Sequence, residues 1–323
     1  MPSPYLYIER PVNLTRVTAC VLLVFWSMMI HMEYDDAISS LTSDDHSYPP
    51  LLKEISSPPR RLYCRGVLPK NSLCIAVVGT RRPTRYGLEI TETLVQGLVD
   101  AGIIIVSGLA TGIDTAAHKA ALDAGGTTIA VLGSGIDDES LFPPQNRGLA
   151  RRIAESGGAV LSEHPPGTNA LKAYFPQRNR IIAGLSQGTV VIEAREKSGA
   201  LITARFALDA NREVFAVPGP AFSPTSYGPH ALIKQGAKLV TSTQDILEEL
   251  GGASYTQERS ARPHANLSDE ETLLLTFLDE PQTVGELKLK TRFETSTLIA
   301  MLSLLELKGL TRTVAIDTYQ KSK

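Results

Sequence analysis

The sequence predicts an α/β fold: a doubly wound, mainly parallel sheet with helices on both faces, and a small C-terminal winged-helix domain. Three observations support this prediction. Between residues 74 and 250, short apolar runs alternate with segments of helical period, which is typical of βαβ units. Residues 251–266 lack periodicity and have linker composition. Three short helical segments and a hairpin-like segment follow this linker.

The predicted elements follow one another in a regular order along the chain. Strands are expected at 74–78, 103–107, 128–132, 159–162, 189–192, 213–217 and 238–240. Helices are expected at 87–100, 113–124, 147–156, 178–185, 201–210 and 243–250. Such sheets bind ligands beyond the carboxyl ends of their strands, so the turns at that edge are the candidates for a site.

The turn after the first of these strands has the features of an anion site. Gly79, Thr80 and Arg81 begin a strand-to-helix loop that holds two further arginines. Amide groups at a helix start lie beside the positive end of the helix dipole, and guanidinium groups match phosphate oxygens. Residues 57–88 include seven basic residues and no Asp or Glu, in a chain of formal net charge −2. This asymmetry favours a polyanion over a small neutral ligand.

Further glycine turns fall at the same edge of the predicted sheet. Ser107, Gly108 and Gly112 lie between the second strand and its helix, and Gly133 follows the third strand. One such turn alone is weak evidence, because many glycine turns only reverse the chain. Several turns on one edge are less easily explained in that way.

A second basic run occupies residues 172–182, and no acid occurs from 166 through 192. Lys and Arg that follow phosphates, together with aromatic rings that stack on bases, hold single strands without sequence readout. We expect Phe175 to contact a base and Tyr174 to lie in the core. The residues of this run that we expect at the site are Lys172, Phe175, Arg178, Asn179 and Arg180.

A last strand-to-helix turn places Ser198, Gly199 and Thr203 at the same edge, although Ser198 is also a plausible helix cap. Glu193 closes the preceding strand, and no convincing acid–base partner accompanies it. His118 and Asp114, at i and i+4 on one helix, are adequately explained as a surface pair. The three cysteines form neither a disulfide framework nor a metal motif. We therefore expect no catalytic residue, no metal, no cofactor, and a cytoplasmic location.

The N-terminal residues 1–47 are an atypical extension with an apolar segment at 17–30. This segment is shorter than the roughly 20 residues of a membrane-spanning helix, and acidic residues follow it where a signal peptide would be cleaved. We expect a buried helix or a poorly ordered extension, and no stable membrane association. An inner-membrane tether is the alternative.

Taken together, the motifs resemble those of the DNA-processing protein A (DprA, or Smf) family, from Tyr48 to the C-terminus. The runs that carry the resemblance are 78–81 with 86–87, 107–114, 175–186 and 198–204. The resemblance implies an extended Rossmann-like domain at 48–250 that binds single-stranded DNA, dimerises and helps load the RecA recombinase in natural transformation. It also implies that Arg81 contacts DNA, that Lys172 belongs to a basic pocket and that Phe175 stacks on a base.

Three features depart from the family pattern. Thr111 stands where many members carry arginine, the usual N-terminal helical domain is replaced by residues 1–47, and the winged-helix domain at 267–323 diverges at its wing. The helix in the position of a recognition helix, 295–307, has no Lys or Arg and is apolar around more than one face. A helix that reads duplex DNA needs phosphate anchors, so we expect this domain to contact protein.

The sequence thus predicts a non-enzymatic protein that binds single-stranded DNA. The alternative is a nucleotide hydrolase that releases a base from nucleoside monophosphates, in which Glu193 would be the catalytic carboxylate. A scaffold whose basic face contacts membrane lipid is a third possibility.

Overall fold

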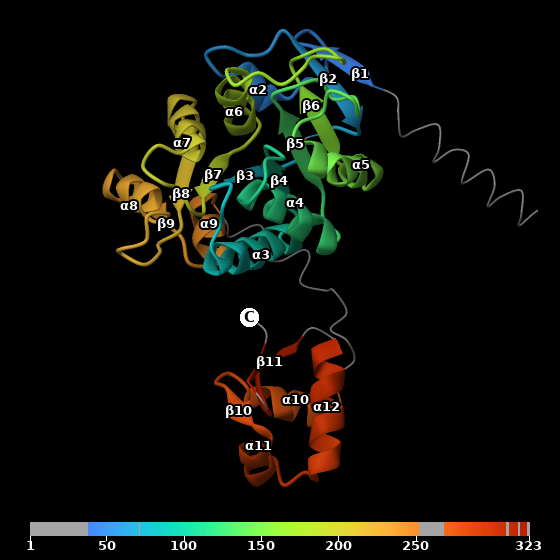
Figure 1. The fold of residues 1–323 in the computed structure, drawn as a ribbon, viewed down its shortest axis with the longest axis vertical. Helices are drawn as coiled ribbons and strands as arrows, with labels where there is room; N and C mark the ends of the chain where they lie inside the picture. Colours follow the sequence, from blue (N-terminus) through green and yellow to red (C-terminus); the bar gives the residue numbers. More distant parts are fainter. Residues whose placement is uncertain (1–37, 71, 252–267, 308–309, 316, 322–323) are drawn as a thin grey trace, which may run out of the picture. The chain divides into compact units, whose positions relative to one another are not determined.

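The computed structural model describes residues 38–70, 72–251, 268–307, 310–315 and 317–321 (Figure 1). The chain divides into two units, Met1–Tyr255 and Thr256–Lys323. The apolar segment 17–30 and nearly all of the predicted linker lie outside the described residues. Within those residues, no helix combines the length and the apolar character needed to cross a bilayer.

A nine-stranded sheet forms the centre of the first unit, in the order β1-β2-β6-β5-β4-β3-β7-β8-β9. Neighbours from β6 to β9 pair in parallel, whereas β1 and β2 are antiparallel additions at one edge. The winding direction reverses between β3 and β7, which confirms the predicted doubly wound sheet. The strands are β1 (Ser39–Thr42), β2 (Arg61–Gly66), β3 (Cys74–Val78), β4 (Ile104–Ser107), β5 (Thr128–Leu132), β6 (Ala159–Ser162), β7 (Gly188–Val191), β8 (Glu213–Ala216) and β9 (Lys238–Leu239).

The helices of this unit follow the predicted order, with two additions and with earlier starts for α3, α6 and α7. They are α2 (Pro50–Lys53), α3 (Arg85–Asp100), α4 (Ile113–Asp123), α5 (Arg147–Glu155), α6 (Tyr174–Gly184), α7 (Gly199–Asp209), α8 (Tyr227–Lys234) and α9 (Thr243–Glu249). The sequence predicts neither α2 nor α8. Helix α6 begins four residues earlier than predicted, because Pro176 falls in its first turn, where a missing N–H costs nothing.

Three apolar clusters cover the two faces of the sheet; two of them contain residues of β3, and the third contains residues of β5, β6 and α5. Alternate residues of β3 belong to different clusters, since Ala76 and Val78 pack in one, and Ile75 and Val77 in the other. The first cluster includes residues of α2, α6, α7 and α8, and the second includes residues of α3, α4 and α9. Figure 1 shows the two sets of helices on opposite sides of the strands. Both faces are therefore buried, as the continuous apolar strands predict.

The second unit contains a three-stranded sheet in the order β10-β12-β11. Its elements are α10 (Asp269–Thr276), β10 (Gln282–Thr283), α11 (Val284–Thr291), α12 (Thr295–Leu307), β11 (Thr311–Ala315) and β12 (Thr318–Lys321). The three helices and the β11–β12 pair occur in the predicted order, and the winged-helix assignment stays a prediction. Helix α12 buries Leu298, Leu302 and Leu305 in the core of the unit, whereas Ile299 and Leu304 are about half exposed.

Helix α4 contributes a buried titratable group to the first unit. The expectation that His118 and Asp114 form a surface pair is wrong, because both side chains are buried. The hydroxyl of Thr128 donates to the carbonyl of Ile105 (2.7 Å), so Nδ1 of His118 donates to Thr128 Oγ1 (2.7 Å). Nε2 of His118 has no partner among the described residues. Burial lowers the pKa of His118 to about 3, so the ring is neutral in the folded protein.

We predict that this histidine makes the fold less stable in acid. Its folded-state pKa of about 3 lies below the ordinary value of 6.5, so the unfolded chain takes up the proton first. The contribution of His118 is complete above pH 6.5 and is lost as the pH falls towards 3, at up to about 1.4 kcal/mol per pH unit. Urea unfolding at pH 7.5 and pH 5 should show a larger loss of stability for the wild type than for His118→Asn. Equal losses in the two proteins would contradict this assignment.

Candidate nucleic-acid interface

The carboxyl edge of the large sheet carries a pocket of about 640 Å³. The turns after β3 and β7 both line it, and the winding direction reverses between these strands. Ligands of doubly wound sheets bind at such a point. Of the predicted site residues, the pocket lining contains Gly79, Thr80, Arg81, Lys172, Phe175, Arg178, Asn179, Ser198, Gly199 and Thr203.

An arginine and two aromatic rings form a cluster at the mouth of this pocket. The guanidinium carbon of the exposed Arg81 lies 5.6 Å from the centroid of the Phe175 ring. The Phe175 ring lies 5.6 Å from the ring of Phe142, at an interplanar angle of 56°. Phe175 lies on the first turn of α6, before the predicted helix start at residue 178. Because the ring of Phe142 is also partly exposed, the cluster offers both π-surface and positive charge to a ligand.

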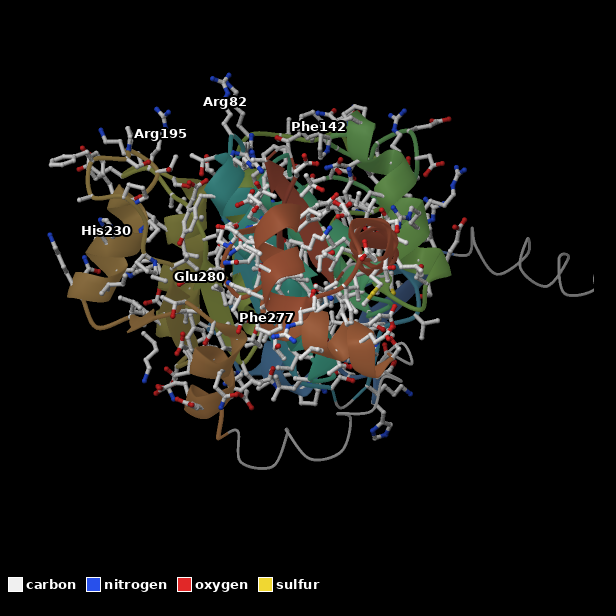
Figure 2. The ribbon with its side chains drawn as sticks, turned by 90° about the horizontal axis from the view of Figure 1, so that it is seen from below. Arg82, Phe142, Arg195, His230, Phe277 and Glu280 are labelled. Carbon is white, nitrogen blue, oxygen red and sulfur yellow. The ribbon has the colours of Figure 1, made fainter. Side chains whose placement is uncertain are left out.

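Four exposed cations line the pocket, namely Arg81, Lys172, Arg195 and Lys197. Within the described part of the chain, none of the four has an ion-pair partner. Figure 2 shows Arg82 and Arg195 projecting from the same edge of the unit that carries Phe142. Three residues at the site are not predicted from the sequence, namely Arg195, Lys197 and Phe142. The signal that could have found them is their position, since they follow β7 and β5 at the carboxyl edge.

Arg178 lines the pocket, but its guanidinium is engaged by hydrogen bonds within the protein. Its side chain is 6% exposed, and it donates hydrogen bonds to the carbonyls of Gly108 and Val131. A further bond from Nε reaches Oδ1 of Asn179 (3.0 Å), and Nη2 lies 3.9 Å from the Asp114 carboxylate. The geometry therefore gives Arg178 a structural role in place of the expected phosphate contact.

Burial has opposite effects on the pKa values of these two charges. It lowers the pKa of Arg178 to about 10, so the guanidinium remains charged at neutral pH. It raises the pKa of Asp114, and the charge of Arg178 opposes that rise. A Cβ at residue 108 would lie only 2.2 Å from Nη2 of Arg178, so the close approach of the guanidinium requires glycine there.

Ser107 and Arg180, also expected at the DNA, are committed elsewhere and do not line the pocket. The buried hydroxyl of Ser107 donates to the carbonyl of Val77 (2.7 Å). The guanidinium of Arg180 forms a two-pronged ion pair with Glu163 (2.9 and 2.8 Å). Its Nε also donates to the carbonyl of Ser57 (2.9 Å). These contacts leave the two residues little capacity to bind a ligand.

Gly112 and Gly133 shape the pocket without lining it. Gly112 has φ +87°, and a Cβ there would lie 2.3 Å from the carbonyl oxygen of Thr80, so the turns after β3 and β4 pack directly on each other. A Cβ on Gly133 would lie 3.2 Å from the ring of Phe175. These glycines let the loops and the aromatic ring approach closely.

Helix α7 directs its N-terminus at the pocket. Ser198 caps the helix by accepting a hydrogen bond from the amide of Ala200 (3.3 Å), and Gly199 is exposed. The Asn179 amide donates to the carbonyl of Gly199 (3.2 Å), which ties α6 to this turn. The positive end of the helix dipole adds to the charge of Arg195 and Lys197. The arrangement suits an anionic group.

Glu193 lies two residues after β7 and links three loops. Its Oε2 accepts from the Thr84 amide (2.9 Å), and its Oε1 accepts from the hydroxyls of Thr84 (2.7 Å) and Thr225 (2.9 Å). Its backbone carbonyl accepts from the amide of Thr80 (2.7 Å). The carboxylate is buried and is not part of the pocket lining. Glu193 therefore holds the loops in place, and its position does not favour a catalytic role.

The described residues contain no cluster of three or more His, Cys, Asp or Glu side chains that could hold a metal ion. Cys64 and Cys74 are buried free thiols. Burial raises the pKa of Cys64 to about 11 and that of Cys74 to about 12. Neither thiol is therefore a reactive thiolate at neutral pH.

Comparisons with known proteins agree with this geometry. The model of the DNA recombination-mediator protein A family matches residues 39–251. DNA processing protein DprA of Bacillus subtilis is 45% identical over 218 residues, which are 67% of this chain and 72% of that protein. Protein Smf of Escherichia coli is 47% identical over 247 residues, which are 76% of this chain and 66% of that protein.

Two solved structures are also similar. The X-ray structure of DprA from Streptococcus pneumoniae matches with a TM-score of 0.61 and 44% identity, over 68% of this chain and 76% of that one. A structure of DNA processing protein A from Helicobacter pylori matches with a TM-score of 0.59 and 30% identity, over 67% of this chain and 97% of that one. The study of the H. pylori protein describes its single-stranded DNA binding mode.

We predict that Arg178→Ala destabilises the fold, whereas Arg81→Ala does not. The loss of Arg178 would leave two buried carbonyls without their donor and would remove the cation beside the buried Asp114 carboxylate, which would keep only its backbone donors, a cost of about 3–5 kcal/mol. Arg81 is exposed, and its loss should change the free energy of unfolding by no more than about 0.5 kcal/mol. Urea unfolding of the two variants tests this difference. Equal stability of the two variants would show that Arg178 is not structural.

Proposed function

The chain belongs to the DNA recombination-mediator protein A family, and we propose that it is a single-stranded DNA-binding protein and not an enzyme. The observation that carries this proposal is the grouping of four exposed, unpaired cations around the Phe142–Phe175 ring pair, in the described pocket where the sheet winding reverses. Exposed guanidinium and ammonium groups bind phosphates, and exposed rings stack on bases of any identity. The DNA-binding mode described for the H. pylori relative supports the same ligand.

The pocket gives its residues distinct roles in this function. Arg81 and Lys172 hold phosphates on the α6 side, and Arg195 and Lys197 hold them on the α7 side together with the helix N-terminus. Phe175 stacks on a base, and the cation–π contact with Arg81 keeps that arginine over the ring. These contacts involve the backbone and the ring faces, so the binding tolerates any sequence.

Two features argue against the alternative of a nucleotide hydrolase. Glu193, its candidate carboxylate, already accepts three hydrogen bonds from protein groups. The cations come from three separate segments, after β3, before α6 and after β7, which makes a longer surface than one nucleotide needs. The positive surface fits a strand better than a monomer.

We further propose that the protein passes bound single strands to the RecA recombinase in natural transformation and recombination, acting in the cytoplasm as a homodimer. The description of the family as a recombination mediator supports this role. The second unit would serve as a protein contact, because α12 carries no Lys or Arg and exposes Ile299 and Leu304. A duplex-reading helix would carry phosphate anchors instead.

Substitutions in the pocket should separate the charge contacts from stacking. Arg81→Ala should weaken binding about equally for all sequences and reduce the slope of log K against log salt by about 0.7. Phe175→Ala should cost about 1–3 kcal/mol with little change in that slope. Fluorescence anisotropy with labelled oligonucleotides at several salt concentrations measures both quantities.

Arg205→Ala is the matched control for these variants. Arg205 is an exposed arginine on α7 that lies outside the pocket and pairs with Asp209. Its loss should leave the affinity within about twofold of the wild type. If Arg205→Ala and Arg81→Ala weakened binding equally, the cations of the pocket would have no special role.

A direct assay distinguishes the protein from a hydrolase. Incubation with nucleoside monophosphates should release no free base above the level of a buffer control, because Glu193 accepts three hydrogen bonds from protein groups and the Asp114 carboxylate, which lines the pocket, is buried beside Arg178. Chromatography of the reaction mixture detects the base. Release of base that is abolished in Glu193→Gln would instead support the enzyme.

A further inference from the structure

The loop between β8 and α8 displays an aromatic side chain to solvent. Phe222 is 94% exposed, more than any other large apolar side chain in the described part of the chain. The loop begins at the carboxyl end of β8, and so at the same edge of the sheet as the pocket. Phe222 itself is not part of the pocket lining. An apolar ring so fully exposed contributes nothing to the core, so its position requires another explanation.

The backbone around Phe222 is held firmly. Pro218, Pro220 and Pro224 restrict the loop. The hydroxyl of Tyr86 donates to the carbonyl of Pro218 (2.7 Å), and the amide of Ala194 donates to the carbonyl of Thr225 (2.7 Å). Contacts on both sides of Phe222 thus anchor the loop and present the ring at a defined place.

The same contacts place the loop beside the cations of the pocket. Ala194 directly precedes Arg195, and its carbonyl also accepts from the amide of Gly228 at the start of α8 (2.8 Å). No Asp or Glu occurs between residues 214 and 244. The acids closest in sequence to Tyr86 and Ala194 are Glu89, which pairs with Arg85, the buried Glu193, and the exposed Glu196, which lies between two cations. The surroundings of Phe222 therefore favour a polyanion over an acidic or neutral partner.

We propose that Phe222 is a second base-stacking position for single-stranded nucleic acid, at the far end of the path that begins at Phe142 and Phe175. This inference rests on the proposed function and extends the site by one loop. The rings at the first end pack near the carboxyl end of β5, and Phe222 follows β8. Four strand spacings of about 4.8 Å separate β5 from β8, so the path is about 19 Å long. That length corresponds to at most roughly six nucleotides at the duplex rise of about 3.4 Å each, and to fewer where the single strand is extended.

The length dependence of binding tests this proposal in the full chain. Phe222→Ala should weaken binding of a 20-nucleotide oligothymidine by roughly 5- to 150-fold, the loss expected for one stacking contact. It should change binding of a thymidine dinucleotide, which cannot span the path even when extended, by less than twofold. Leu208→Ala is the control, because Leu208 is an exposed apolar residue at the C-terminal end of α7, outside the pocket. Unchanged thermal unfolding of both variants excludes misfolding.

Photocrosslinking provides a second, direct readout. An oligonucleotide that contains 5-iododeoxyuridine should crosslink to Phe222, and mass spectrometry of the peptides identifies the position. Wild-type affinity of Phe222→Ala for the long oligonucleotide, or no crosslink to its loop, would overturn the proposal. If Phe222→Ala had no effect while Phe175→Ala still weakened binding of both oligonucleotides, only this inference would fail and the proposed function would stand. If Arg81→Ala and Phe175→Ala were also without effect, the proposed function itself would fail.

Discussion

Two buried charges of opposite sign hold the carboxyl edge of the sheet in its binding conformation. Glu193 accepts hydrogen bonds from the loops after β3 and β8, and Arg178 donates to the carbonyls of Gly108 and Val131 at the ends of β4 and β5. A buried charge that loses its partners is costly, which keeps each loop close to one conformation. The hydrogen bonds of Glu193 and Arg178 therefore fix how the loops, the strand ends and helix α6 meet. The position of the pocket's cations and rings depends on that arrangement.

The loops held by Glu193 and Arg178 carry a group of like charges whose mutual repulsion would otherwise be unfavourable. Arg81, Lys172, Arg195 and Lys197 lie around one pocket with no acid paired to them among the described residues. Like charges held together repel one another, and a polyanion relieves that repulsion when it binds. The chain therefore divides its charges in two groups. At the carboxyl edge of the sheet, the buried charges of Glu193 and Arg178 fix the loops, and the four exposed cations face the ligand.

The sequence predicts the fold better than it predicts the role of each charge. The strands at 74–78, 128–132 and 159–162 occur with the predicted bounds, because apolar runs of this length must be buried. Helix α8 escapes prediction because Gly228 and Pro229 are poor helix formers that only tertiary contacts accommodate. Arg178 and Arg180 look like ligand contacts in the sequence. Their acidic partners, Asp114 and Glu163, lie on other elements and become visible only in three dimensions.

The central claim is that unpaired cations at the point of reversed winding hold a single strand. The salt dependence of binding to single-stranded and duplex oligonucleotides of equal length tests this claim most directly. Four phosphate contacts predict that log K for the single strand falls against log salt with a slope of about −3. The account also predicts weaker binding to the duplex, whose paired bases cannot stack on Phe175. A slope near zero, or tighter binding to the duplex, would contradict it.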